Sequence, residues 1–335
     1  MNKLFARQKI VVLRALIQWG FFFWVVFIGI RFGMFVRHFE NGGTTPFVTR
    51  PPGVEGFLPI GALVSLKYWL VSGTINPVHP AALVIFLSIV LMSLLAKKSF
   101  CSWLCPVGTL SEDAANLGRR IFGRNFTIWR RLDVALRGIK YLLLLFFVKL
   151  ILIDMPAQAL AAFLDTPYWA VSDVKMLHFF TRMSVVTMVV LTILTGLSFL
   201  YANFWCRYLC PYGALLGLVS ILSPWKIRRD ASRCTGCGSC SAACPSSLPV
   251  HAREVVRSAE CNGCLSCVVN CPEKDTLRMA PPLGKRPLPV WVFATVVVLL
   301  FAGGIVAGIA TGNWQSSLGY ADYRQLMPMV PYLSH

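Results

Sequence analysis

Cysteine is the residue type in this chain whose spacing points most directly to chemistry. All twelve cysteines fall in short motifs, and eight of them form two copies of the pattern C-x2-C-x2-C-x3-C-P. Three thiolates on one turning loop can surround three corners of a cubic centre, and a distant residue can close the fourth. The first copy contains Cys234, Cys237, Cys240 and Cys244, and the second contains Cys261, Cys264, Cys267 and Cys271.

This pattern is the bacterial ferredoxin spacing, in which the fourth cysteine of each run binds the other cluster. The sequence therefore predicts two [4Fe–4S] clusters. Glycines within the loops permit the unusual backbone angles that such loops use; they are Gly236, Gly238 and Gly263. The predicted ligands of cluster 1 are Cys234, Cys237, Cys240 and Cys271, and those of cluster 2 are Cys261, Cys264, Cys267 and Cys244.

Zinc and disulfide bonds are the alternative uses of these eight cysteines. Structural zinc sites usually take their ligands two by two, whereas each run here has three cysteines plus one, followed by proline. Disulfides are rare in a reducing cytoplasm, and the basic residues near these motifs favour a cytoplasmic location. Both alternatives fit less well than the two clusters.

The remaining four cysteines form two C-x3-C-P motifs within an internal repeat, FCSWLCPVGTL and WCRYLCPYGAL. A residue before proline avoids the helical region, so we expect Pro106 and Pro211 to start new helices. A helix N-terminus favours thiolate. The repeat suggests a shared third metal centre, while buried structural thiols or two separate redox-active pairs are the alternatives. The four residues are Cys101, Cys105, Cys206 and Cys210.

The elements that must position these motifs are apolar segments. Hydrophobic residues make up 56% of the chain and charged residues only 14%, below the roughly 25% of soluble proteins. Five segments approach the roughly 20 apolar residues that cross a bilayer. A sixth, 56–75, is interrupted by Pro59 and Lys67, which indicates an interfacial or re-entrant helix. The five predicted spans are 12–36, 79–96, 138–155, 177–203 and 289–312.

The net charge of +18 reflects basic loops rather than nucleic-acid binding. Lys and Arg concentrate in the loop 97–140 and around 226–233. Because cytoplasmic loops collect these residues, we expect a multi-pass protein of the bacterial inner membrane. The N-terminus and the clusters would then be cytoplasmic, and the C-terminus would be periplasmic.

The predicted fold is an all-α polytopic membrane protein with a small α+β ferredoxin-like domain that holds two [4Fe–4S] clusters. Residues 1–225 would form a membrane domain with four transmembrane helices and both C-x3-C-P motifs. Residues 226–285 would form the cytoplasmic cluster domain. Residues 286–335 would supply a final transmembrane helix and an outer tail. In that helix, Gly304, Gly308 and Gly312 form a small-residue stripe for close packing, either within the protein or against a partner.

The ordered set of four cysteine motifs resembles the NapH/NosR-type membrane polyferredoxins, especially the short NapH-like or YccM-like members. The resemblance covers roughly residues 79–282. It implies electron transfer between the quinone pool and a partner redox protein, such as a ferredoxin, a cytochrome or a reductase subunit. It also implies a role as a subunit of a quinol-oxidising complex. The chain lacks the flavin-binding domain of NosR and has no C-x-x-C-H haem motif, so neither haem nor covalent flavin is expected.

A quinone site needs a polar group beside an apolar pocket. Lys149 lies within a predicted span, where an ionisable residue is a functional candidate by default. His79 and His178 lie near the ends of predicted spans and titrate near neutral pH. The alternative for Lys149 is a snorkelling or ion-paired side chain, and for the two histidines an interfacial anchor.

Two other functions compete with electron transfer. A redox sensor or a metalloenzyme maturation factor would use the clusters or thiols as a signal. A permease is disfavoured because few charges lie within the predicted spans. No Gly-rich phosphate loop or nucleophile elbow is present, so the sequence predicts neither a hydrolase nor a nucleotide-driven pump.

Overall fold

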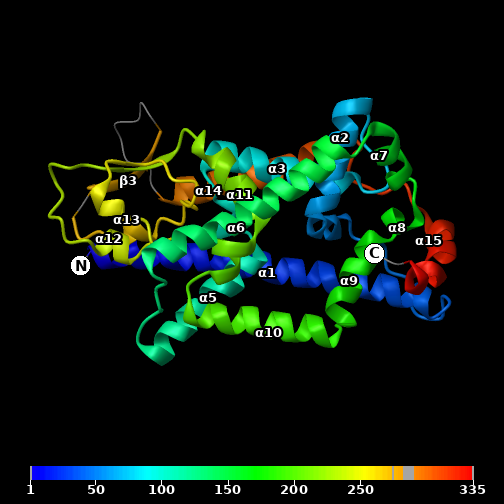
Figure 1. The fold of residues 1–335 in the computed structure, drawn as a ribbon, viewed down its shortest axis with the longest axis horizontal. Coiled ribbons are helices and arrows are strands. Elements are labelled where there is room, and N and C mark those ends of the chain that lie inside the picture. Colours follow the sequence, from blue (N-terminus) through cyan, green and yellow to red (C-terminus); the bar gives the residue numbers. More distant parts are fainter. Residues whose placement is uncertain (1, 274, 282–289, 334–335) are drawn as a thin grey trace. The chain divides into compact units, whose positions relative to one another are not determined.

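The computed structural model describes residues 2–273, 275–281 and 290–333, which are mostly helical (Figure 1). The chain divides into two compact units. Unit 1 comprises Met1–Phe22, Ile89–Leu144 and Thr192–Phe301 and carries all twelve cysteines. Unit 2 comprises Phe23–Ser88, Leu145–Leu191 and Ala302–His335.

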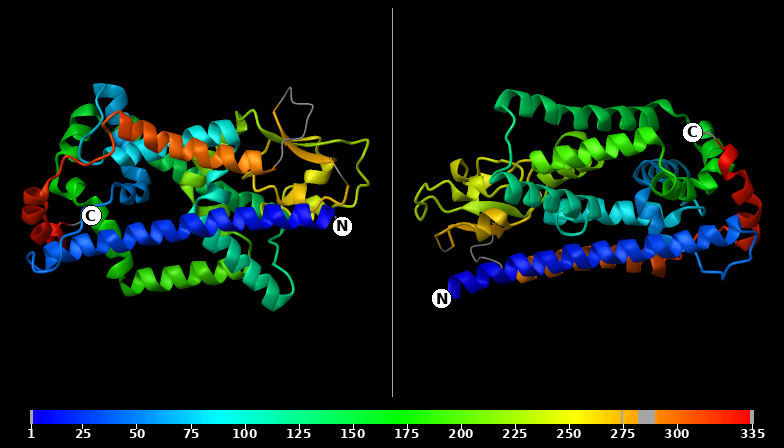
Figure 2. Two further views of the ribbon diagram at one scale, coloured as in Figure 1. Left: turned by 180° about the vertical axis from the view of Figure 1, so that it is seen from behind. Right: turned by 90° about the horizontal axis from the view of Figure 1, so that it is seen from below.

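Among the described residues, two helices are long and apolar enough to cross a membrane on their own. They are the stretch Ile10–Glu40 of α1 (Asn2–Glu40) and the stretch Trp291–Ala310 of α14 (Val290–Ala310). Both run without a break, in blue and orange in Figure 2. They confirm the helical character of the first and last predicted spans and make the chain a membrane protein.

The fourth predicted span, 177–203, is wrong as a single straight helix. The chain forms α9 (Ser172–Thr181) and α10 (Val185–Leu200), bent by 73° at the break between them. The Ser184 hydroxyl accepts a hydrogen bond of 3.2 Å from the Thr187 amide. This side-chain cap satisfies an N-terminal amide and starts a new helix. The bent pair is apolar enough to count as a third candidate span.

The other apolar segments are shorter or less regular. The helix α3 (Pro80–Ala96) has 17 residues. The helix α6 (Arg130–Val148) continues into the π-helical turn η2 (Lys149–Asp154). The helix α2 (Pro59–Ser72) has 14 residues, fewer than the roughly 20 needed for a span. That the segments 79–96 and 138–155 cross the membrane stays a prediction.

In unit 1, residues 226–281 form a small cysteine-rich domain (Figure 1). Its sheet has the order β2-β1-β3, all antiparallel. Ile227 pairs with both Val256 and Met279, so three buried apolar side chains lie in one row across the sheet. The elements are β1 (Lys226–Arg229), α12 (Ser239–Ala242), η4 (Val250–Ala252), β2 (Val255–Val256), α13 (Ser266–Val269) and β3 (Leu277–Ala280).

Short helical turns carry the C-x3-C-P motifs of unit 1. Cys105 and Cys210 are extended residues that precede helices, and Pro106 and Pro211 are the first helical residues, as predicted. Cys206 lies in a π-helical turn, a feature common at functional sites. The elements are α4 (Phe100–Trp103), α5 (Pro106–Phe122), η3 (Trp205–Leu209) and α11 (Pro211–Ile221).

Unit 2 is built around an aromatic core on α1 and a buried ionic network. Phe35 and Tyr323 pack edge to face at 4.9 Å. On α14, a Cβ at Gly304 would lie 1.9 Å from Ser88 Oγ, and one at Gly308 would lie 2.5 Å from Val84 Cγ1. Two glycines of the stripe therefore pack against α3 of the same chain. The other elements are η1 (Pro52–Phe57), α7 (Ala157–Leu164), α8 (Pro167–Ala170), α15 (Tyr320–Leu326) and η5 (Met327–Tyr332).

Candidate metal centres

Two cavities in the cysteine-rich domain are lined by the eight cysteines of the doubled motif. The first, of about 310 Å³, also has Arg229 and His251 in its wall, and its Cys237 is exposed. Its cysteines are Cys234, Cys237, Cys240 and Cys271. The second, of about 350 Å³, is lined by Cys244, Cys261, Cys264 and Cys267. The structure thus brings the fourth cysteine of each run to the other run, in the grouping that the spacing predicts.

The second cavity is the more enclosed of the two. Cys264 and Cys267 are buried, and apolar side chains complete its wall. These side chains are Ile227, Leu248, Val250, Val256 and Leu265. A more apolar, less solvated environment changes the reduction potential of a bound cluster, so the two sites are electrostatically different.

Both loops need left-handed backbone at equivalent positions. In the first run Gly236 and Gly238 both have φ of 72°, and in the second Gly263 has φ of 64° and Leu265 has φ of 62°. A non-glycine residue in this region costs roughly 1–2 kcal/mol. Leu265 is 2% exposed and lines the second cavity, so its burial offsets that cost. The sequence analysis named the three glycines but not this leucine.

The donor sets fit iron–sulfur clusters better than single metal ions. Within the described residues, no three His, Cys, Asp or Glu side chains converge on a point that could hold one metal ion. The four cysteines of each group instead line one cavity. Four thiolates around one cavity match the Cys₄ ligand set of a [4Fe–4S] cluster.

The four C-x3-C-P cysteines also converge. Burial raises the pKa of Cys101 to about 11 and that of Cys105 to about 12. Burial raises the pKa of Cys206 as well, and its neighbours Cys210, Cys105 and Cys101 raise it further. The thiols of Cys101, Cys105, Cys206 and Cys210 are therefore close enough to interact electrostatically. As anions they would repel each other unless a cation or a metal cluster stabilised them.

A loop contact joins this cysteine group to the second cavity. The Trp103 indole donates a hydrogen bond of 3.1 Å to the Gly263 carbonyl, and the Ser102 hydroxyl donates one of 2.6 Å to the Asn262 carbonyl. The two donors lie between Cys101 and Cys105 in the chain. The two acceptor carbonyls belong to residues between Cys261 and Cys264. Direct hydrogen bonds therefore connect the two ligand loops.

Helix α1 fixes the same loop from another direction. Arg14 and Gln18 donate hydrogen bonds of 3.0 and 3.1 Å to the Ser102 carbonyl, and both also contact Glu112 on α5. Arg14 is 9% exposed and Gln18 is 8% exposed. The sequence analysis did not identify this contact, because Arg14 and Gln18 are far from Ser102 and Glu112 in the chain.

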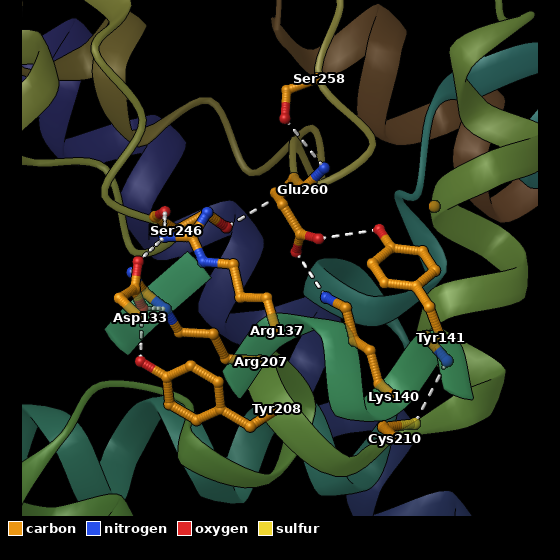
Figure 3. Close-up of polar contacts among 12 residues, drawn as sticks. Asp133, Arg137, Lys140, Tyr141, Arg207, Tyr208, Cys210, Ser246, Ser258 and Glu260 are labelled. Carbon is orange, nitrogen blue, oxygen red and sulfur yellow. Dashed lines mark hydrogen bonds and ion pairs between the residues drawn. The ribbon is translucent and has the colours of Figure 1, made fainter. Parts of the chain in front are cut away.

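A carboxylate beside the second motif holds a buried lysine (Figure 3). Lys140 Nζ lies 2.6 Å from Glu260 Oε2, and the Tyr141 hydroxyl donates to Oε1 at 2.9 Å. Burial alone would raise the pKa of Glu260, but Lys140 and Lys98 outweigh it and hold the pKa below its usual value. Since Glu260 precedes Cys261, this contact anchors the ligand loop to α6. The sequence analysis missed the pair because the two residues are distant in the chain.

A second carboxylate anchors the other C-x3-C-P motif (Figure 3). Arg207 donates to both carboxylate oxygens of Asp133, from Nε and from a terminal nitrogen, each at 2.9 Å. The Tyr208 hydroxyl and Arg137 each approach the same carboxylate at 2.5 Å. Burial would raise the pKa of Asp133, but the hydrogen bonds from Arg207 and Tyr208 outweigh it and lower the pKa. The turn that carries Cys206 is therefore fixed to α6.

The three quinone-site candidates all lie in unit 2, each with a polar partner. Lys149 Nζ lies 2.6 Å from Asp154 Oδ2, and its side chain is 63% exposed. His178 Nε2 lies 3.1 Å from Glu40 Oε1. His79 is fully buried, and its Nε2 lies 2.8 Å from the Trp169 carbonyl oxygen.

His79 belongs to a buried ionic network. Its Nδ1 lies 3.2 Å from Arg50 and 3.3 Å from Glu55 Oε1. Arg50 also pairs with Asp173 at 2.7 Å. Burial would lower the pKa of Arg50, but Asp173 and Glu55 outweigh it and raise the pKa. The network joins the loop before η1 to the start of α3 and to α9.

Comparisons with known proteins agree with this cysteine geometry. The family model "4Fe-4S binding domain" matches residues 78–125 and 183–230, one copy around each C-x3-C-P motif. The family model "4Fe-4S dicluster domain" matches residues 226–272. The chain is 46% identical over 315 residues to YccM of Escherichia coli (strain K12), a candidate electron transport protein, which covers 92% of this chain and 88% of the relative.

More distant relatives share the cysteine-bearing part. The chain is 30% identical over 197 residues to the protein NirI of Paracoccus denitrificans, covering 57% of this chain and 28% of NirI. It is 26% identical over 168 residues to the ferredoxin-type protein NapH of Haemophilus influenzae, covering 48% of this chain and 54% of NapH. No solved structure matches the chain. The chain belongs to the NapH/NosR-type family of membrane polyferredoxins and binds iron–sulfur clusters.

Proposed function

We propose that this protein carries electrons between the membrane quinone pool and a soluble redox partner through three iron–sulfur centres. When bound, such clusters supply one-electron transfer. The observation that carries the proposal is the pair of hydrogen bonds that links Ser102 and Trp103 to Asn262 and Gly263. It connects the C-x3-C-P cysteines to the second cavity, and the second cavity lies in the same small domain as the first.

The ligands follow the grouping around the cavities. Cys234, Cys237, Cys240 and Cys271 would hold cluster 1, and Cys244, Cys261, Cys264 and Cys267 would hold cluster 2. The exposed Cys237 makes the first site accessible to a soluble partner. Apolar side chains such as Leu265 exclude water from the second site. The first site, at one end of the series, is thus open, whereas the second site, in the middle of the series, is more enclosed.

The third centre would be held by Cys101, Cys105, Cys206 and Cys210. Four neighbouring thiols cannot all be anionic without nearby positive charge, because thiolates repel each other. Bound iron removes this conflict, and four cysteines are the number that a [4Fe–4S] or [2Fe–2S] centre needs. Two separate redox-active thiol pairs fit less well, because the structure brings both motifs together.

The membrane arrangement follows from charge. The basic loop 97–140 and the cysteine-rich domain would lie in the cytoplasm and the C-terminus in the periplasm of a bacterial inner membrane. Residues 1–225 and 286–335 would then supply five spans, one of them the bent pair α9–α10. Residues 226–285 would form the cluster domain. A reporter fused after His335 would be active only outside the cytoplasm under this arrangement.

The decisive experiment is a quadruple Cys→Ser variant at positions 101, 105, 206 and 210. We expect the parent protein to contain iron beyond the roughly eight atoms of two [4Fe–4S] clusters. The variant should lose only that excess and should no longer be reduced by a quinol analogue, while the paramagnetic signals of clusters 1 and 2 persist. Equal iron contents in parent and variant would exclude the third centre.

The same membranes separate electron transfer from redox sensing. An electron carrier is reduced by quinol and reoxidised by its partner within the turnover time of the pathway. A sensor or maturation factor has no need of such rates. Stopped-flow measurements give the rate at which a quinol analogue reduces the clusters. A rate slower than the turnover of the pathway would reject the electron-transfer proposal and favour the sensor.

A further inference from the structure

Two consecutive lysines between α3 and α4 are buried. Lys97 is 0% exposed and Lys98 is 6% exposed. Lysine is almost never fully buried unless it is paired. A cytoplasmic location of the basic loop 97–140 does not by itself account for two buried lysine side chains.

The two side chains face different cysteine groups. Lys97 has φ of 62°, a left-handed conformation that a non-glycine residue rarely adopts outside functional or strained sites. Its amide donates to Ser223 Oγ at 3.1 Å. The chain changes direction at Lys97, so the side chains of Lys97 and Lys98 point toward different cysteine groups. The hydrogen bond from the Lys97 amide to Ser223 stabilises this conformation.

Lys97 packs on the ligand loop of the second cavity. Its Nζ donates to the Ser258 carbonyl at 3.4 Å. Its Cβ lies 3.5 Å from where a Cβ on Gly263 would be. Burial lowers the pKa of Lys97 and Lys226 lowers it further, while Cys261 is the group that favours the protonated form. Lys97 is therefore the ammonium group associated with cluster 2.

Lys98 lies among the C-x3-C-P cysteines. Its Nζ and the Sγ of Cys210 are each 3.5 Å from where a Cβ on Gly213 would be. Burial would lower the pKa of Lys98, but Cys101 and Glu260 raise it, followed by the other two nearby thiols. Those thiols are Cys210 and Cys206. Lys98 is therefore the ammonium group associated with the proposed third centre.

We propose that Lys97 and Lys98 are separate electrostatic controls, Lys97 raising the reduction potential of cluster 2 and Lys98 that of the third centre. The Lys98 half rests on the third centre proposed above, whereas the Lys97 half does not. Reduction adds negative charge, so a fixed positive charge stabilises the reduced form of the nearer centre. Salt screens buried charges only weakly.

Other charged side chains near Lys97 and Lys98 do not cancel the positive charge of these two lysines. Glu260 is the carboxylate beside Lys98, but Lys140 is bound to the same carboxylate at 2.6 Å. Lys98, Lys140 and Glu260 together therefore leave one net positive charge next to the C-x3-C-P thiols. On the other side, Lys226 adds positive charge to that of Lys97. Against the effect of burial, Lys97 lowers the pKa of Cys261 more than Lys98 does, whereas Lys98 is the one of the two that lowers the pKa of Cys101 and Cys206.

The test compares Lys97→Met and Lys98→Met with Lys97→Arg and Lys98→Arg in the full-length, cluster-loaded protein. Redox titrations followed by electron paramagnetic resonance give the midpoint potential of each centre. We expect each Met variant to weaken reduction of its own centre at least tenfold, which is about 59 mV for one electron. The other centres should keep their potentials, and both Arg variants should resemble the parent.

The outcomes distinguish this proposal from the function above. A shift of the same centre in both Met variants, or no shift, overturns the separate roles. Loss of a centre in the Met but not the Arg form supports the charge role, whereas loss in both forms overturns it. A parent protein without a third signal contradicts the third centre and the Lys98 half. A third signal that Lys98→Met leaves unmoved contradicts the Lys98 half alone.

Discussion

The Trp103 indole and the Gly263 carbonyl are joined by a hydrogen bond of 3.1 Å between two cysteine ligand loops. Trp103 is 0% exposed, and its ring packs on Phe293 with a centroid separation of 6.0 Å. A buried indole that donates to a backbone carbonyl fixes both partners, because the unpaired groups would be costly. This contact therefore sets the spacing between the C-x3-C-P cysteines and the second cavity.

Trp103→Phe should weaken this connection without emptying the cavities. Loss of the hydrogen bond leaves the buried Gly263 carbonyl without its donor, at a cost of about 1–3 kcal/mol. We expect a lower unfolding temperature and slower reduction of cluster 2 by a quinol analogue. Trp129→Phe is the matched control, because Trp129 is 71% exposed. Equal effects of the two changes would show that the contact has no special role.

Gly304→Leu should disrupt the packing of α14 on α3. A Cβ at Gly304 would already lie 1.9 Å from Ser88 Oγ, and overpacking of this kind typically costs about 1–3 kcal/mol. Gly303→Leu makes the same chemical change one residue earlier, where no atom lies within 4 Å of the added Cβ. Thermal unfolding in detergent should show a loss for Gly304→Leu only. A similar loss in both variants would contradict the close contact.

The features that were predictable from sequence are those that short spacing encodes. The grouping of Cys271 with the first run and Cys244 with the second follows from the ferredoxin spacing. The helix starts at Pro106 and Pro211 follow from the geometry of proline. In each case neighbouring residues supply the whole physical cause.

The features that escaped prediction depend on distant partners or on single polar atoms. Lys140 and Glu260 form an ion pair at 2.6 Å although they are far apart in the chain. The chain breaks at residues 182–184, between α9 and α10, where Arg182 ends one helix and the Ser184 hydroxyl caps the next, although hydropathy averages the segment into one span. Lys98 is close to Cys101 in the sequence, but composition cannot show that its side chain is buried.

Asp133 should make the stability of unit 1 depend on pH. Hydrogen bonds from Arg207 and Tyr208 hold its pKa below the usual value. A carboxyl with a lowered pKa stabilises the folded state above its unfolded pKa of about 3.9, and this stability is lost as pH falls through the lower folded pKa. The unfolding-temperature difference between the parent and Asp133→Asn should therefore be constant near pH 6 and shrink below about pH 4. A difference that does not change with pH would contradict the ionised contact.

Glu260→Gln should destabilise the junction between α6 and the second ligand loop. The change removes the anion that Lys140 contacts and leaves a buried ammonium group without its partner, which typically costs about 3–5 kcal/mol. Glu254→Gln is the control, because Glu254 is exposed in the same domain. Denaturant unfolding and the iron content of purified protein measure the effect. If the two variants are equally stable, the Glu260–Lys140 pair does not hold the loop.

Lys149→Met tests the proposed quinone site. Of the three candidates, Lys149 has the side chain most open to a membrane ligand, since it is 63% exposed, while His79 is fully buried. Its position in the π-helical turn η2 is typical of functional sites.

If the ammonium group contacts a quinone oxygen, its loss should slow cluster reduction by quinol about tenfold, or about 1.4 kcal/mol in the barrier. Asp154→Asn keeps the lysine but removes its ion-pair partner at 2.6 Å, so it should slow reduction much less. Iron content should be unchanged in both variants. Reduction rates equal to the parent's in Lys149→Met would leave Lys149 as the ion-pair partner of Asp154 alone.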